Sequence, residues 1–167
     1  MGNFFMTMNY KNIPGSKIHN EEFLALVALA GMLGNGFFRF VWGGIVQNFG
    51  FKWAFLIAMV LNIFSFVSIP LAINYYNFYL LSYTIAGTVA GGLMVLMTSL
   101  SLLVFGEVGN QMFGYLWGAF TLSNFIQYLM GATIAKIVPH YQLIIFFAAT
   151  SLVALIISSI VKYQGRW

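Results

Sequence analysis

The chain contains no cysteine and very few charged side chains. The missing cysteine excludes a disulfide framework, thiol chemistry and a cysteine-ligated metal site. Only 6% of the 167 residues are Asp, Glu, Lys or Arg, whereas a soluble domain has about 25%. This composition excludes a soluble protein. Because 61% of the residues are hydrophobic, the sequence predicts an integral membrane protein.

The formal net charge is +4, but the basic residues are few, and all but one lie near the ends of apolar runs. That distribution is typical of lipid contacts and topology signals, and it predicts no nucleic-acid partner. The sequence also lacks a nucleophile elbow, a His/carboxylate metal motif and a phosphate-binding glycine loop. We therefore predict no enzyme activity, no cofactor and no metal site.

Five apolar segments are long enough to cross a bilayer, whose hydrocarbon core of about 30 Å needs roughly 20 helical residues. They cover residues 23–46, 53–73, 78–105, 112–135 and 141–161, with short breaks at 47–52, 74–77, 106–111 and 136–140. Apolar and polar residues do not alternate, which excludes outer-membrane strands. The sequence thus predicts an all-α, multi-pass membrane protein with five transmembrane helices. Residues 3–9 are apolar but too few to span, and they are predicted to be the end of a further helix.

Arg39 is the only charged residue inside these five segments. An arginine at the centre of a membrane helix costs about 2.5–3.5 kcal/mol on insertion scales and is a functional-site hypothesis by default. Helical spacing places it on one stripe with Met32, Asn35, Gly36 and Gly43. A stripe of small and polar residues predicts that Arg39 faces protein or a water-filled cavity. The alternative is that Arg39 snorkels or pairs structurally, because its Cα is about 12 Å from the end of its span and the long side chain could reach much of that distance toward water.

Small residues at four-residue spacing occur in the third and fourth segments, as the pairs Gly87/Gly91 and Gly114/Gly118. Such pairs predict close packing between helices and do not specify a function. In the second segment, Asn62 and Ser65 are predicted to form hydrogen bonds to neighbouring helices.

The fourth segment has the richest uncharged polar face. Asn124 and Tyr128 share one face, Thr121 lies one turn before them, and Gln127 is nearby. Hydrogen bonds between helices are one explanation of these residues. A cavity that binds a substrate is the other, and we keep both.

Residues 42–52 read Trp-Gly-Gly-Ile-Val-Gln-Asn-Phe-Gly-Phe-Lys. This stretch resembles the loop between helices eight and nine of major facilitator superfamily transporters, as a degenerate copy of G-x-x-x-D-R/K-x-G-R/K-R/K. Gly43, Gly50 and Lys52 match the motif, and Gln47 stands where the family has an acid that helps to latch the cytoplasmic gate. The resemblance implies a gating loop that contains these four residues, and Gln47 argues against a charge-based latch in it.

The wider context resembles one branch of that family, the oxalate:formate antiporters and monocarboxylate transporters. Members carry an arginine four residues before the motif glycine, as Arg39 precedes Gly43 here, and it is implicated in pairing with the substrate carboxylate. Monocarboxylate transporters also have an acid where this chain has Asn35. Oxalate:formate antiporters have a lysine in helix 11, which residues 112–135 lack. Neither lactate nor oxalate is therefore assigned.

The resemblance covers residues 1–167 as helices 8–12, preceded by the end of helix 7. It implies the C-terminal half of a secondary transporter that binds a small organic anion, a monocarboxylate or a dicarboxylate, near the membrane midplane. Arg39 would hold the carboxylate. The other expected substrate-binding residues are Asn35, Thr121, Asn124, Gln127 and Tyr128.

Alternating access requires two halves, so the chain is expected to depend on an N-terminal six-helix half or on a partner chain in the same lipid bilayer. The alternative is a non-transporting membrane bundle, derived from the same fold, that serves interaction or scaffolding. In that case Arg39 would bond only to neighbouring helices.

Overall fold

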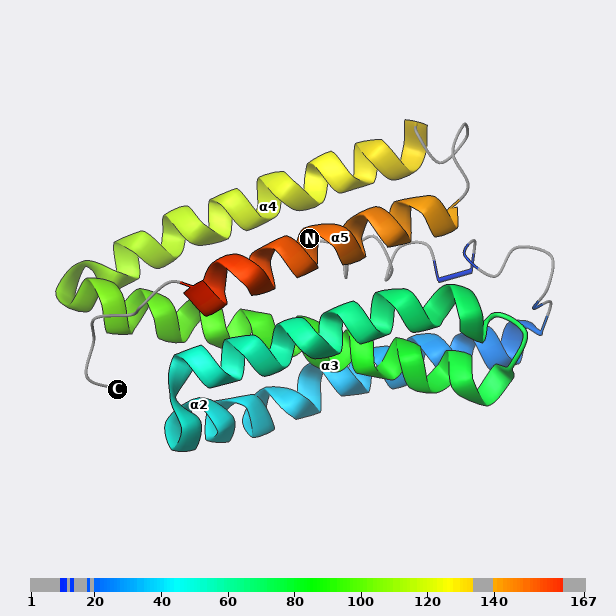
Figure 1. The fold of residues 1–167 in the computed structure, drawn as a ribbon, viewed down its shortest axis with the longest axis horizontal. Helices are drawn as coiled ribbons and strands as arrows, with labels where there is room; N and C mark the ends of the chain where they lie inside the picture. Colours follow the sequence, from blue (N-terminus) through cyan, green and yellow to red (C-terminus); the bar gives the residue numbers. More distant parts are fainter. Residues whose placement is uncertain (1–9, 12, 14–17, 19, 134–139, 161–167) are drawn as a thin grey trace.

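The described part of the chain is built from helices. The computed structural model describes residues 10–11, 13, 18, 20–133 and 140–160. Its elements are α2 (Glu21–Ala72), α3 (Tyr76–Phe105), the 3-10 segment η2 (Gly106–Val108), α4 (Gly109–Thr133) and α5 (His140–Ile160). Figure 1 shows the helices running along the long axis of the molecule. No strand occurs in the described residues, and the prediction of an all-α fold is confirmed.

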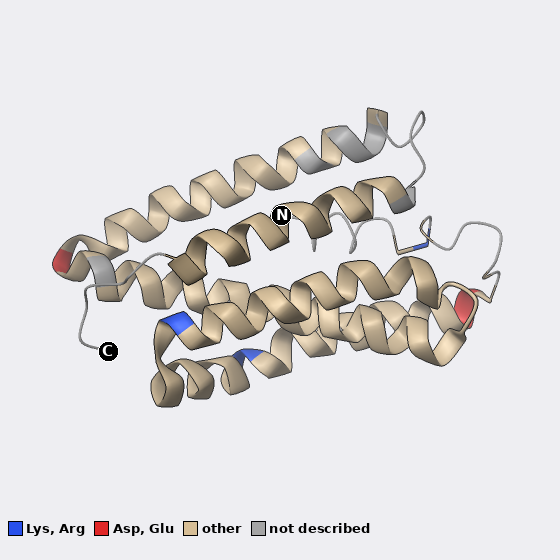
Figure 2. Ribbon diagram, in the orientation of Figure 1, with Lys and Arg blue, Asp and Glu red and all other residues tan. Residues whose placement is uncertain are grey.

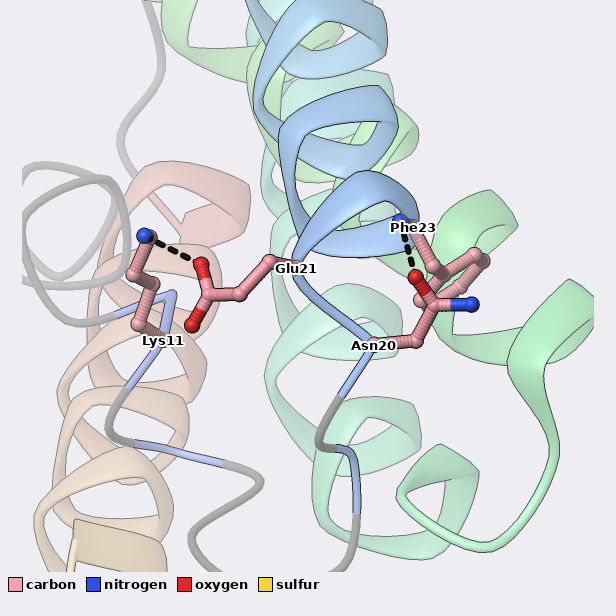
Figure 3. Close-up of polar contacts among 4 residues, drawn as sticks. All are labelled: Lys11, Asn20, Glu21 and Phe23. Carbon is pink, nitrogen blue, oxygen red and sulfur yellow. Dashed lines mark hydrogen bonds and ion pairs between the residues drawn. The ribbon is translucent and has the colours of Figure 1, made fainter.

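Polar contacts define the start of α2. Asn20 Oδ1 accepts a hydrogen bond from the Phe23 amide at 3.0 Å, which satisfies one of the N–H groups that a helix start leaves without a partner. Glu21 and Glu22 fill the first turn, where the helix dipole favours negative charge. Glu21 also accepts from Lys11 Nζ at 2.6 Å (Figure 3). That hydrogen bond raises the pKa of Lys11 above its ordinary value.

Gly50 divides α2 into two antiparallel parts. It has φ 79° and ψ 165° between residues that are otherwise helical, and the left-handed region of φ is readily open only to glycine. The chain reverses at this residue (Figure 1), so the N-terminal part of α2 (residues 21–49) and its C-terminal part (residues 51–72) run in opposite directions. The break predicted at 47–52 is thus narrower than expected, because helical geometry continues to Phe49 and resumes at Phe51.

The other predicted breaks agree with the structure to within a few residues. The chain between α2 and α3 is residues 73–75, where 74–77 was predicted, and the η2 segment occupies the start of the predicted break at 106–111. Gly106 has φ 53°, which lets the chain leave α3. The break predicted at 136–140 falls mostly on residues outside the described ones, as do residues 3–9.

Three helices among the described residues are long and apolar enough to cross a membrane: α2, residues 76–103 of α3 and residues 142–160 of α5. Because α2 reverses at Gly50, its two parts are about 43 Å and 33 Å long at 1.5 Å per residue, and the hydrocarbon core of a bilayer is about 30 Å thick. α4 is not among the three, and it is interrupted by polar residues such as Asn110, Gln111 and Asn124. The composition therefore supports membrane association, whereas five crossings remain a prediction.

The helices pack around two clusters of buried side chains, and α2 packs most extensively against α3 and then α5. The first cluster joins both parts of α2 to α3 and α5, through residues such as Leu24, Val27, Phe66, Ile69, Tyr79, Tyr83, Ile144 and Phe147. The second lies near Gly50 and contains Trp42, Phe51, Ala54, Ala58 and Leu96. No described residue of α4 belongs to either core, so the described core is formed by α2, α3 and α5.

Candidate functional site

Arg39 stands apart from the other described charges, which lie at or near helix ends and connections: Lys11, Glu21, Glu22, Lys52 and Glu107. Figure 2 shows how sparse charged positions are along the helices. Arg39 is eleven residues before Gly50 in the N-terminal part of α2, which corresponds to about 16 Å along the axis. A positive charge is thus placed well inside an apolar helix.

Both contacts of Arg39 are to neutral atoms. Its Nη2 donates to Asn35 Oδ1, one turn earlier on α2, at 2.8 Å. The same nitrogen approaches Met94 Sδ on α3 at 3.1 Å. A guanidinium has five N–H donors, and both of these contacts use Nη2. Nε and Nη1 therefore make no hydrogen bond to the residues the structure describes. Because no described carboxylate pairs with Arg39, its charge is not compensated within this part of the chain.

One edge of the predicted Arg39 stripe is open. Met32 is 67% exposed, and a Cβ added at Gly36 or Gly43 would meet no other atom within 4 Å. The Arg39 side chain is itself exposed. The stripe therefore has two sides. On one side Asn35 packs against α3, and the other side is left uncovered by the described residues.

The opposite edge packs backbone to backbone against α3. A Cβ added at Gly87 would overlap Gly31, and one added at Gly91 would overlap the backbone carbonyl of Asn35. Gly34 is similarly close to Thr84 of α3. The close packing predicted for Gly87 and Gly91 is confirmed, and it brings Asn35 and Arg39 up to α3.

Trp42 is a residue of this interface that the sequence did not single out. It is 2% exposed, and its Nε1 donates to the Thr88 carbonyl oxygen at 2.9 Å. A Cβ at Gly92 would overlap the Trp42 ring, so glycine there makes room for the indole. In the sequence, Gly92 indicated that a second small residue follows Gly91, but it did not indicate that the Trp42 ring fills the space beside it.

The structure does not bring the polar residues of α4 together with Arg39. α4 packs against α3 and η2, and it has no extensive contact with α2. Thr121 donates to Trp117 O within its own helix at 2.9 Å, and Tyr128 is 60% exposed. Asn124 is half-buried, and its Oδ1 is buried with no hydrogen-bond partner. Gln127 lies in α4, but its side chain is outside the described part.

The glycine pair of α4 is also open. A Cβ at Gly114 or at Gly118 would find no other atom within 4 Å. The prediction that this pair packs closely against another helix is therefore wrong for the described structure, because the spacing fixes a face of α4 but not whether a helix lies on it.

The predicted gating loop forms the end of the α2 hairpin. Gly43 is open, Gly50 makes the reversal, Lys52 is half-buried and Gln47 is exposed. Gln47 and Gly50 line a hollow of about 510 Å³ that the hairpin end forms with the last turns of α3. The loop is thus a tight reversal beside a cavity.

Asn62 joins the C-terminal part of α2 to α5. Its Nδ2 donates to Ser151 Oγ at 3.0 Å, which confirms the predicted hydrogen bond between helices. Asn62 is 5% exposed, and its Oδ1 has no partner. Ser65 instead donates to Leu61 O of its own helix at 2.9 Å, so the prediction of an interhelical bond for Ser65 is wrong.

The described residues contain no group of three or more His, Asp or Glu side chains that could hold a metal ion. Comparisons with protein-family models, curated proteins and solved structures yield no match to this chain. The chemistry of the candidate site therefore rests on Arg39 and on what surrounds it.

Proposed function

We propose that the chain is part of a membrane transporter for a small organic anion, and that Arg39 binds the carboxylate of that anion. The observation that carries the proposal is an exposed guanidinium, inside an apolar helix, whose contacts are the neutral Asn35 and Met94. A charge in such a place is costly and generally functional. An anion would compensate it.

The surroundings of Arg39 suit a ligand that binds and leaves. Nε and Nη1 have three N–H donors without a partner in the described structure. The Met94 sulfur is a weak acceptor, so a carboxylate can replace it and accept from Nη2 and Nη1 together. Asn35 remains bonded in this arrangement and holds the side chain on its stripe.

We place the chain in the bilayer as a multi-pass protein. Its three apolar helices support this, and the two parts of α2 extend about 43 Å and 33 Å at 1.5 Å per residue, each enough for one crossing. An anion site on Arg39 would then lie well inside the membrane. Transporters of small solutes place their binding sites near the midplane.

The open edge of the stripe suggests that other helices complete the site. A Cβ added at Gly36 or Gly43 would meet no atom of another element within 4 Å, and Phe40 is 83% exposed. We propose that an N-terminal half like that of major facilitator transporters, or a partner chain, covers this edge and closes the cavity around Arg39. Asn124, Thr121, Gln127 and Tyr128 of α4 are proposed to line the cavity only in that complete assembly.

Anion uptake by the complete assembly in proteoliposomes tests the proposal. Arg39→Gln keeps a polar, shorter side chain but removes the charge, and it should lower anion affinity about 10- to 150-fold, since hydrogen bonds to charged groups contribute about 1.5–3 kcal/mol. Lys11→Gln removes a charge at the other end of the N-terminal part of α2 and should leave uptake unchanged. Equal uptake by Arg39→Gln and the parent protein would exclude the carboxylate role.

A second candidate is a non-transporting bundle, which the contact of Arg39 with Met94 favours because it connects α2 to α3. In that case Arg39→Gln would lower the unfolding free energy and affect no ligand. Circular dichroism of the variant in detergent, measured beside uptake, separates the two functions.

A further inference from the structure

A hollow at the end of the α2 hairpin is a ligand-sized space away from Arg39. Its volume is about 510 Å³, within the roughly 300–1,000 Å³ typical of small-molecule sites. The walls combine apolar side chains of Phe49, Leu102 and Leu103 with polar ones of Gln47, Asn48 and Ser99. The three apolar side chains are also exposed on the outer surface, so the hollow adjoins an apolar outer surface.

Helix length places this hollow at the level of lipid headgroups. The N-terminal part of α2 runs about 43 Å from Glu21 to the turn at Gly50, close to the 40–45 Å of a bilayer that includes both headgroup regions. Glu21 at one end and the turn at the other therefore lie at opposite membrane surfaces. Trp53, just after the turn, is exposed, as is common for tryptophan at a membrane surface.

A positively charged residue adjoins the lining of the hollow in the sequence. Lys52 directly follows Phe51 in the lining, is half-buried and forms no ion pair with the described residues. The C-terminal part of α2 begins immediately after Gly50, so the positive end of its dipole lies beside Lys52. Glu107 is the described acid beyond the end of α3, and it does not pair with Lys52.

We infer that this hollow binds an anionic phospholipid, with one acyl chain against Phe49, Leu102 and Leu103 and the phosphate at Lys52 and the helix start after Gly50. The inference rests on the membrane placement in the proposed function but not on transport or on Arg39. A lipid held there would fix the tight reversal of the hairpin. Basic residues beside pockets at membrane surfaces can bind anionic headgroups, and Lys52 would supply one such charge here.

Thermal unfolding of the purified protein in detergent, with added lipid, tests the inference. Phosphatidylglycerol at about a hundred times its Kd should raise the midpoint by roughly 5–10 °C, and phosphatidylcholine or inorganic phosphate alone should raise it much less. Lys52→Gln should abolish the difference between the two lipids. Lys11→Gln, the matched loss of a lysine at the opposite end, should keep it.

A second variant tests the acyl-chain contact. Ser99→Trp fills the hollow and should reduce the number of phosphatidylglycerol molecules retained in native mass spectrometry. Lys52→Gln should also reduce this number, although it adds no bulk to the hollow. Equal stabilisation by both lipids, an unchanged response of Lys52→Gln, or full stabilisation by inorganic phosphate would overturn the inference. So would a dimer that shows no lipid response, because a second copy would then cover the hollow. Anion uptake that depends on Arg39 can persist in each of these cases, so failure here is distinct from failure of the proposed function.

Discussion

Gly91 of α3 lies against the backbone carbonyl of Asn35 in α2, with no room for a Cβ between them. Asn35 in turn accepts from Arg39 Nη2 at 2.8 Å. The absence of one side chain on α3 therefore sets how closely the helix that carries Arg39 can approach. Gly91 of α3 thus contacts Asn35 of α2, and Asn35 in turn holds Arg39.

Gly91→Ala should destabilise the protein by about 1–3 kcal/mol, as overpacked substitutions do, although alanine is the better helix former by about 1 kcal/mol. The reason is that the neighbour is backbone, which cannot rotate away. Unfolding by sodium dodecyl sulfate in mixed micelles, followed by circular dichroism, measures the change. Gly118→Ala is the control, because its Cβ meets no other atom within 4 Å, and it should be neutral or stabilising. Equal effects of the two substitutions would contradict the close approach at Asn35.

Trp42 and Gly92 should behave as a coupled pair. Trp42→Ala is expected to cost about 3–5 kcal/mol as a buried aromatic truncation, and Gly92→Ala about 1–3 kcal/mol because its Cβ overlaps the indole. In the Trp42→Ala background, Gly92→Ala should lose most of its cost, since the added methyl group enters the vacated space. A double-mutant cycle on unfolding free energies measures this, and strictly additive costs would mean that the ring and Gly92 do not meet.

Asn62 and Ser151 should show a modest coupling. Their hydrogen bond of 3.0 Å connects α2 to α5, and such bonds in membrane proteins average about 0.6 kcal/mol, with roughly 1.7 kcal/mol as the upper end. A cycle of Asn62→Ala and Ser151→Ala gives the coupling energy. Ser65→Ala is the comparison, because Ser65 bonds within its own helix, and it should show no coupling to Ser151→Ala.

Asn35→Asp should weaken anion binding in the complete assembly. The new carboxylate would lie one turn from Arg39, at the position of the present 2.8 Å bond, and would compensate its charge locally. We expect the anion affinity to fall about tenfold or more, the equivalent of at least 1.4 kcal/mol, with folding preserved. Asn35→Ala removes the same bond without adding charge and should have the smaller effect on affinity. If both variants bind anions alike, charge on Arg39 does not control binding.

The helices could be predicted because their cause is local. Uninterrupted apolar runs need a backbone that forms its hydrogen bonds internally, and the predicted break at 47–52 contains the reversal at Gly50. Tertiary relationships were harder to predict, as the two glycine pairs illustrate. Gly87/Gly91 and Gly114/Gly118 have the same spacing, yet only the first pair has a helix against it. Spacing specifies a face, whereas contact also requires that another helix reach that face.

Polar side chains in the helices show the same limit. Asn62 forms the expected bond to α5, but Ser65 satisfies its hydroxyl on the carbonyl four residues earlier, an option always open to serine in a helix. Arg39 was recognisable from its position in the sequence, because it is a lone charge in an apolar run. Its neutral neighbour Met94 is 55 residues away in sequence, and no pattern pointed to it.

The reversal at Gly50 has a consequence for sidedness. Because α2 turns back at one residue, its first and last residues lie at the same end of the molecule (Figure 1). In a membrane, a chemical label at Asn20 and another at Asn74 would be reached from the same compartment, and a label at Asn48 from the opposite one. In the proposed membrane placement, the two parts of α2 would cross the bilayer in opposite directions, and Arg39 would lie in the first of them.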